Sequence, residues 1–419
     1  MVDPTKVAIR RPVAVDLFAG AGGMSLGLEQ AGFDVAAAVE YDPVHAATHE
    51  FNFPRSATIC ASVGDVDAQE IRRRSDIGNS VDLVAGGPPC QGFSMIGKRD
   101  LGDERNSLVL EFHRLVVELN ARYFVMENVP GMAVGAQRQV LDELIARFEK
   151  SGYRCSRPWL LAASDFGVPQ RRTRLFLVGA RGEERLPEPP EPNSFRPTVW
   201  EALGDLPEVE HYPELLNRDW VDAKFGDPSA YASELRGIRR TPGDYSDPRV
   251  WDPRVLTSSA RTVHTSLSIS RFEQTAPGAV EPISRFLRLD PNGLCNTLRA
   301  GTDGKRGAYT SPRPIHPMEP RVITVREAAR LHSFPDWFRM HTTKWHGFRQ
   351  VGNAVAPFVG RAVGTTIVNA LGARPSRRRG AISLGNPHLL ELSMGEAADY
   401  YGVPRDVVGN RDRPASRKG

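Results

Sequence analysis

The chain has 419 residues, which is too long for one ordinary hydrophobic core, so we expect at least two domains. Its composition, 40% hydrophobic and 25% charged, is typical of a folded globular protein and excludes disordered and fibrous classes. The net charge of +4 permits a nucleic-acid partner without requiring one.

The first part of the chain alternates short apolar runs with helical patterns. Buried strands are predicted at 13–17, 35–40, 81–85, 123–126 and 174–179. Helices are predicted from about Met24 to Gly32, over 108–119 and over 140–148. Strands that alternate with helices indicate an α/β fold with a doubly wound, mostly parallel sheet.

This alternation stops near Arg185. A linker rich in Pro and Glu follows, and the chain stays irregular to about residue 320. Helical patterns return at 325–331 and 355–371, and a basic stretch begins beyond Arg374. We therefore divide the chain into 1–185, a second, smaller and irregular domain at 186–320, a return to the first domain at 321–372, and a tail at 373–419.

A glycine-rich turn, DLFAGAGG at 16–23, stands directly after the first strand and before a helix. Its glycines allow a tight turn and a close approach of the backbone to a ligand. Glu40 ends the next strand, where a carboxylate can accept hydrogen bonds from ribose hydroxyls. The pair indicates a nucleoside cofactor. The spacing departs from the GxGxxG dinucleotide fingerprint, which favours a methyl-donating nucleoside over NAD.

Two further motifs lie at strand ends. GGPPCQGFS at 86–94 places Cys90 after one strand, and FVMENVP at 124–130 places Glu127 after another. Ligands of open α/β sheets bind at this edge. A structural cysteine prefers an apolar run, so the polar loop around Cys90 favours a reactive thiol over a buried one. Glu127 alone could cap the next helix, but a thiol and a carboxylate at this edge can also converge on one substrate.

The other cysteines are scattered. Cys60, Cys155 and Cys295 form no CxxC spacing with one another or with Cys90, which argues against a zinc site and a disulfide scaffold, so no metal is expected. The basic N-terminus lacks the apolar segment of a secretory signal, and no apolar run is long enough to span a bilayer. We expect a cytoplasmic protein that does not contact a membrane.

Two more motifs complete a set: QRRTR at 170–174, and RQVGNAV at 349–355 before the last helix. The five motifs, in this order, resemble those of the bacterial cytosine-5 DNA methyltransferases that serve restriction-modification or phage defence. The resemblance covers roughly residues 12–180 and 320–372. It implies a Rossmann-like fold that uses S-adenosyl-L-methionine, with 1–185 as catalytic domain and 186–320 as target-recognition domain.

The resemblance also implies roles for particular residues. Those expected to bind the cofactor are Phe18, Gly20, Gly22, Gly23, Glu40, Asp65, Pro89, Leu108, Asn353 and Val355. Those expected to act in catalysis are Cys90 as nucleophile, Glu127 at the flipped cytosine, and Arg172 and Arg174 as the basic residues that steady the base and the catalytic groups.

The implied partner is double-stranded DNA, with a cognate restriction enzyme or other defence proteins as further candidates. One chain carries every motif, so a monomer is sufficient. Two substrates or roles compete with DNA methylation. An RNA substrate is disfavoured because the Cys-Phe-Thr signature of the tRNA-modifying branch is absent. A DNA-binding regulator on an inactive scaffold is disfavoured because Cys90, Glu127 and Asn353 are intact. A nicotinamide oxidoreductase is a distant third alternative.

The tail has faint helix-turn-helix spacing at 396–403, and we favour a small accessory helix there over a DNA-reading unit. Because every motif lies before Leu371, the sequence alone predicts that truncation after this residue leaves turnover largely intact.

Overall fold

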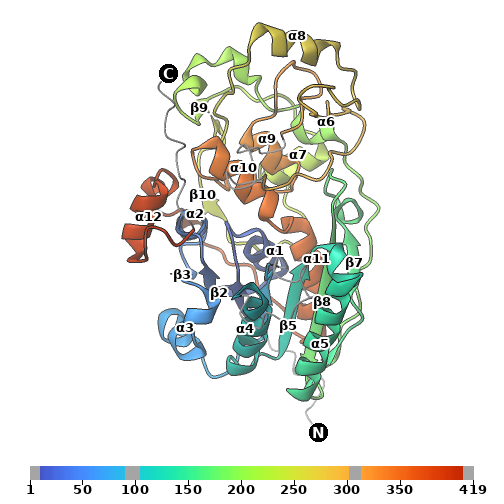
Figure 1. Cartoon of the computed structure of the whole chain (residues 1–419). Coiled ribbons are helices and arrows are strands. Elements are labelled where there is room, and N and C mark those ends of the chain that lie inside the picture. The colour runs from blue at the N-terminus through green and yellow to red at the C-terminus, as the bar shows by residue number, and fades with distance from the viewer. Residues whose placement is uncertain (1–9, 90–103, 302–312, 409–419) are drawn as a thin grey trace, which may run out of the picture.

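The computed structural model describes residues 10–89, 104–301 and 313–408. Its centre is an eight-stranded sheet in the lower half of Figure 1, with strand order β3-β2-β1-β4-β5-β8-β6 and with β7 paired to β8. The strands are β1 (Val13–Leu17), β2 (Asp34–Glu40), β3 (Ala57–Cys60), β4 (Leu83–Gly86), β5 (Tyr123–Asn128), β6 (Tyr153–Cys155), β7 (Trp159–Ala162) and β8 (Thr173–Arg181).

Strands β1 to β5 run parallel to one another. Strand β8 runs antiparallel to β5, and β6 and β7 run antiparallel to β8. The prediction of a mostly parallel, doubly wound sheet is therefore confirmed. The strand predicted at 174–179 is present and longer, while β3, β6 and β7 were not predicted. Because β1 to β5 are parallel, their carboxyl ends share one edge of the sheet, where the motifs lie.

Helices cover both faces of this sheet. One apolar core joins it to α1 (Gly23–Ala31) and α11 (Pro357–Ala370), and the other joins it to α3 (Ala68–Ser75), α4 (Glu104–Glu118) and α5 (Ala136–Lys150). Helices α1 and α11 approach closely, since a Cβ at Gly27 would lie 2.6 Å from the Gly360 Cα. The return segment thus completes the first domain. In the described parts of the chain, no helix is both long and apolar enough to cross a membrane.

The described residues of the irregular region, 186–301 and 313–320, lie mainly in the upper part of Figure 1 and form short elements. The helices are α6 (Val199–Leu203), α7 (Ala230–Leu235) and α8 (Ser266–Gln274), and the strands are β9 (Val221–Asp222), β10 (Arg249–Val250) and β11 (Val255–Leu256). The return segment adds α9 (Val325–Arg330) and α10 (Lys344–Asn353). Arg330 of the return segment is fully buried and donates to Asp336 of the same segment at 2.6 Å and to Asp205 of the irregular region at 2.8 Å. The ion pair with Asp205 connects the two regions.

Single turns of 3-10 helix complete the description. They are η1 (Val63–Asp65), η3 (Pro130–Ala133), η4 (Ala163–Phe166), η5 (Val209–His211), η6 (Pro213–Leu216) and η8 (Pro387–Leu390).

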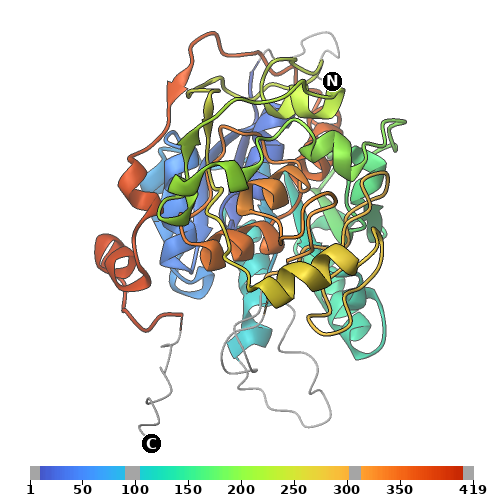
Figure 2. The same cartoon turned by 90° about the horizontal axis from the view of Figure 1, so that it is seen from above.

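The tail packs on the rest of the chain as far as the structure describes it. Strand β12 (Ile382–Ser383) pairs with β10, and α12 (Met394–Tyr401) lies beside α2 (Pro43–Asn52) in Figures 1 and 2. The small helix expected at 396–403 is therefore present. Truncation after Leu371 would uncover apolar side chains of α2, so we expect the shortened chain to be less stable, while its turnover stays a prediction.

Candidate active site

The glycine-rich turn is shaped by close contacts. Phe18 follows β1 with a φ of 60°, a conformation that is costly for a residue with a side chain. A Cβ at Gly22 would lie 2.2 Å from the Phe53 ring, and one at Gly23 would lie 2.3 Å from the Val355 carbonyl oxygen. Beside Gly20 there is open space. The turn is thus held against the segment after α10 and leaves room for a ligand at Gly20.

Glu40 connects this turn to helix α2. Its Oε2 accepts a hydrogen bond from the Gly20 backbone N–H at 2.7 Å, and its Oε1 accepts one from the Asp42 N–H at 2.9 Å. Burial raises the pKa of the Glu40 carboxyl, whereas His45 and the backbone N–H groups oppose the shift. A carboxylate has about four lone-pair sites, so two remain for the hydroxyls of a ribose.

The other predicted cofactor residues lie around the same sheet edge. Asp65 is exposed in η1 after β3, and Pro89 is exposed after β4. Leu108 is half-buried near the start of α4. Asn353 is exposed at the end of α10, while Val355 is buried against the glycine-rich turn. Apolar walls with a few acidic and amide groups suit an adenine nucleoside.

Glu127 stands at the end of β5 and is largely buried. Its Oε1 lies 2.9 Å from the Nε of Arg174 on β8. A Cβ at Gly87 would lie 3.0 Å from Glu127 Oε2, and Asn128 donates to the Pro88 carbonyl oxygen at 3.0 Å. The chain that leads to Cys90 therefore passes directly beside Glu127. Cys90 itself lies outside the described residues.

Two opposing effects act on the pKa of Glu127. Burial raises the pKa of its carboxyl, and the guanidinium groups of Arg174 and Arg172 oppose this shift. A carboxyl with a raised pKa donates a hydrogen bond more readily at neutral pH than an exposed glutamate does.

Arg172 has different contacts from Arg174. It is buried, and it donates to the carbonyl oxygens of Leu298 at 2.9 Å, Gly352 at 3.1 Å and Ala354 at 2.8 Å. Burial lowers the pKa of Arg172, and the charge of Arg174 lowers it further. Arg172 thus connects the irregular region at Leu298 to the RQVGNAV segment, whereas Arg174 contacts the Glu127 carboxylate.

A second junction beside Arg172 was not predicted from the sequence. The buried His332 accepts a hydrogen bond at Nδ1 from Gln170 Nε2 at 2.9 Å and donates from Nε2 to the Ala354 carbonyl oxygen at 3.0 Å. Burial lowers the pKa of His332 far below its usual value, so the ring is neutral. Gln170 could be identified from the sequence because it is the first residue of the QRRTR motif, whereas His332 lies in none of the five motifs.

The thiols in the described part of the chain are poor nucleophiles. Burial raises the pKa of Cys60 and of Cys155 to about 12, and it also raises the pKa of the fully buried Cys295. Because the thiolate is the reactive form, these groups are inert at neutral pH.

The irregular region, which the resemblance assigns to target recognition, carries basic side chains that could contact DNA phosphates. Arg288 instead donates to the carbonyl oxygens of Phe272 and Thr275, each at 3.0 Å, which is a structural role. Arg271 lies 3.8 Å from Glu281, and Lys305 lies outside the described residues. These contacts single out no residue as a reader of bases.

The sheet order, the glycine-rich turn and the acidic end of β2 define the Rossmann-like class of methyltransferases that use S-adenosylmethionine. The family model of C-5 cytosine-specific DNA methylases matches residues 13–369. The chain therefore belongs to the family of DNA (cytosine-5-)-methyltransferases.

Relatives agree with this assignment. The type II methyltransferase M.XorII of Xanthomonas oryzae pv. oryzae is 56% identical, over 97% of this chain and 96% of its own length. The type II methyltransferase M.AgeI of Thalassovita gelatinovora is 31% identical, over 85% and 99%. A solved E. coli structure of a candidate DNA modification methyltransferase encoded within a prophage has a TM-score of 0.72 and 35% identity, over 86% and 99%.

Proposed function

We propose that this enzyme flips a target cytosine out of double-stranded DNA and methylates C5 through a covalent adduct between Cys90 and C6. The observation that supports the proposal is the approach of residues 87–89, which directly precede Cys90, to Glu127: Asn128 bonds the Pro88 carbonyl oxygen, and Gly87 packs against the carboxylate. The target carbon is buried in the base stack of a duplex, so flipping is required, at a cost of about a few kcal/mol.

The residues divide the chemistry between them. The Cys90 thiolate forms a bond to C6, and the electron pair of the C5–C6 double bond shifts so that C5 becomes nucleophilic. Glu127 donates its proton to N3 and offsets the charge that develops on the ring. Arg174 holds Glu127 in place for this contact. After methylation, solvent takes the C5 proton, the C6–S bond breaks to release the thiolate, and N3 returns its proton to Glu127, which restores the aromatic ring.

S-adenosylmethionine, when bound, supplies the methyl group as an activated sulfonium. The proposed binding residues are those that surround the glycine-rich turn. Glu40 would accept hydrogen bonds from the ribose, Asp65 would contact the adenine amino group, and Phe18 would pack near the ring. Asn353 and Val355 would close the pocket from the C-terminal side, which agrees with the contact between Gly23 and Val355.

Substitution of Glu40 by alanine should weaken S-adenosylmethionine binding by ~1.5–3 kcal/mol, the scale of hydrogen bonds to a charged group. Isothermal calorimetry measures the change. The control is Glu184→Ala, which removes a carboxylate whose ion pair with Arg122 lies outside the proposed pocket. Unchanged affinity in the Glu40 variant would remove this residue from the cofactor site.

Sequence choice should reside in residues 186–320. Replacement of this segment by that of a family member with a different target should move the methylated site, because bases are read by side chains in the grooves. Bisulfite sequencing of DNA from cells that express the chimera identifies the site. An active chimera that keeps the original target would contradict the domain assignment.

Protection of the cell's own DNA is the proposed role, either beside a cognate restriction enzyme or within a phage-defence system. The type II names of M.XorII and M.AgeI support the first of these. A cytoplasmic location follows from a DNA substrate in a bacterium, and a monomer is sufficient. Bisulfite sequencing of a host that expresses the wild-type protein tests the reaction and reveals the target sequence together.

A further inference from the structure

The described part of the tail, residues 373–408, runs along the molecule from one edge of the sheet toward the other, and we call it the C-terminal strap. It begins after α11, passes the amino ends of the strands, and reaches α2 through η8 and α12 (Figure 1). Two separate sets of contacts hold the strap: one joins it to the amino ends of β1 and β2, and the other joins it to α2.

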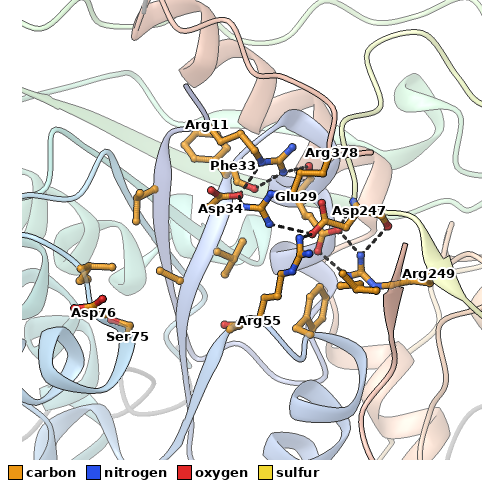
Figure 3. A pocket seen from close by; sticks show the side chains of 17 residues that line it. Arg11, Glu29, Phe33, Asp34, Arg55, Ser75, Asp76, Asp247, Arg249 and Arg378 are labelled. Atoms are coloured by element: carbon orange, nitrogen blue, oxygen red, sulfur yellow. Dashed lines mark hydrogen bonds and ion pairs between the residues drawn. The ribbon is translucent and has the colours of Figure 1, made fainter. Parts of the chain in front are cut away.

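The first anchor lies at the amino ends of β1 and β2. Arg378 donates to Asp34 at 2.8 Å and to Asp247 at 3.1 Å (Figure 3). Arg11 also bonds Asp34, and Arg55 also bonds Asp247, each at 2.7 Å. This anchor joins the strap to both domains, at the edge opposite to the proposed cofactor site.

The second anchor covers the outer side of α2. The strap places the buried side chains of Leu389, Leu390, Leu392 and Ala397 against Val44, Ala47 and Phe51 of that helix. A Cβ at Gly385 would lie 2.9 Å from the Phe51 Cα. The hydroxyls of Tyr400 and Tyr401 donate to the two oxygens of Glu50, at 2.8 and 2.7 Å. The strap therefore buries the outer face of α2, from Val44 to Phe51.

A chain of hydrogen bonds continues from the strap to the inner side of α2. His341 Nε2 donates to the Leu392 carbonyl oxygen at 3.0 Å, and the His341 backbone N–H donates to Gln350 Oε1 at 2.9 Å. Gln350, within the RQVGNAV motif, donates from Nε2 to Thr48 Oγ1 at 2.8 Å. Helix α2 therefore contacts the strap directly on its outer side, and on its inner side it contacts Gln350, which is linked to the strap through His341.

The first turn of α2 is continuous with the proposed ribose site. Asp42, which caps the helix by accepting from the Val44 N–H at 3.0 Å, donates its own N–H to Glu40 Oε1. A shift of α2 would therefore move the donor that orients the Glu40 carboxylate.

We propose that the C-terminal strap positions α2, and through it Glu40, for binding of S-adenosylmethionine. Leu390 and Leu392 are the main positioning residues, and Tyr400 and Tyr401 support them. The inference rests on the proposed role of Glu40 as a cofactor ligand. It predicts a specific defect in cofactor affinity when the strap loosens, with the binding of DNA left intact.

The test uses the full chain with two kinds of variant. Leu390→Ala together with Leu392→Ala loosens the second anchor, and Tyr400→Phe together with Tyr401→Phe removes only two hydroxyls. The matched control is Arg378→Gln, which loses two ion pairs at the first anchor. The Kd for S-adenosylmethionine is measured by calorimetry, KM for each substrate by steady-state kinetics, and Tm by thermal melting.

The leucine variant should raise the Kd and KM for S-adenosylmethionine roughly five- to twentyfold, and the tyrosine variant roughly two- to fivefold. KM for DNA, and kcat at saturating cofactor, should stay near wild type in both. Arg378→Gln should lower Tm without a change in the Kd for the cofactor. A merely structural role would lower Tm in all three variants and leave cofactor affinity unchanged.

Wild-type cofactor affinity in a folded leucine variant would overturn the proposal. If that variant does not fold, wild-type affinity in the tyrosine variant overturns it instead. Glu40→Ala separates the two levels of inference. If Glu40→Ala weakens binding and the strap variants do not, the strap proposal alone fails. If Glu40→Ala binds normally, the proposed role of Glu40 fails, and with it the route by which the strap would act.

Discussion

Replacement of Cys90 by serine should abolish methyl transfer, because an alcohol is a far weaker nucleophile than a thiolate at neutral pH. Adduct trapping makes the role of this residue visible. Fluorine at C5 of the target cytosine cannot leave as a proton, so wild-type protein should stay joined to DNA after methylation. We expect a complex that survives denaturing electrophoresis, that requires S-adenosylmethionine, and that Cys90→Ser does not form.

Cys60→Ser and Cys155→Ser are matched controls, since burial raises the pKa of both thiols to about 12. Both variants should trap DNA as the wild type does. Peptide mapping of the complex should place the crosslink at Cys90. A crosslink at another cysteine, or methylation that persists in Cys90→Ser, would contradict the proposed mechanism.

Conversion of Glu127 to glutamine should slow trapping and turnover by about 10²- to 10⁴-fold, the range of general acid catalysis. The amide has the size of the carboxylate and can still hydrogen-bond to a base, but it cannot transfer a proton to N3. DNA binding, measured by fluorescence anisotropy, should be retained. Single-turnover rates at saturating DNA separate the chemical step from binding.

Glu143→Gln serves as the control for Glu127→Gln, because it makes the same change on an exposed face of α5. Its rate should equal that of the wild type. A Glu127→Gln variant with the wild-type rate would remove the proton donor from the mechanism. A variant that no longer binds DNA would assign Glu127 to substrate binding rather than to acid catalysis.

The central strands could be predicted from the sequence because they are buried on both faces and read as short apolar runs. Helix α2 could not, and its contacts give the reason. Its polar Thr48, His49 and Asn52 are buried, while Ala47 and Phe51 also contact the distant strap. A helix enclosed on all sides by polar and apolar partners has no amphipathic pattern to detect. Its burial depends on residues more than 300 positions later.

The site was predictable where local sequence fixes it. Glu40 and Glu127 end strands, and glycines shape the turn between β1 and α1, so each stands out within a few residues. The distinction between Arg172 and Arg174 was not predictable, since both belong to one motif. Arg172 is defined by backbone carbonyls that only the folded chain brings to it. Every residue has a backbone carbonyl, so the sequence does not indicate which of them Arg172 will contact.

The contacts of Arg172 bear on how this enzyme can acquire new targets during evolution. Its guanidinium donates a hydrogen bond to the carbonyl oxygen of Leu298, within the proposed target-recognition domain (186–320), and every amino acid supplies that atom. This contact between Arg172 and the segment 186–320 therefore does not depend on which side chain stands at position 298. Recognition segments of unrelated composition could be exchanged by recombination and still dock on the same catalytic half, provided that their backbone follows the same course past Arg172.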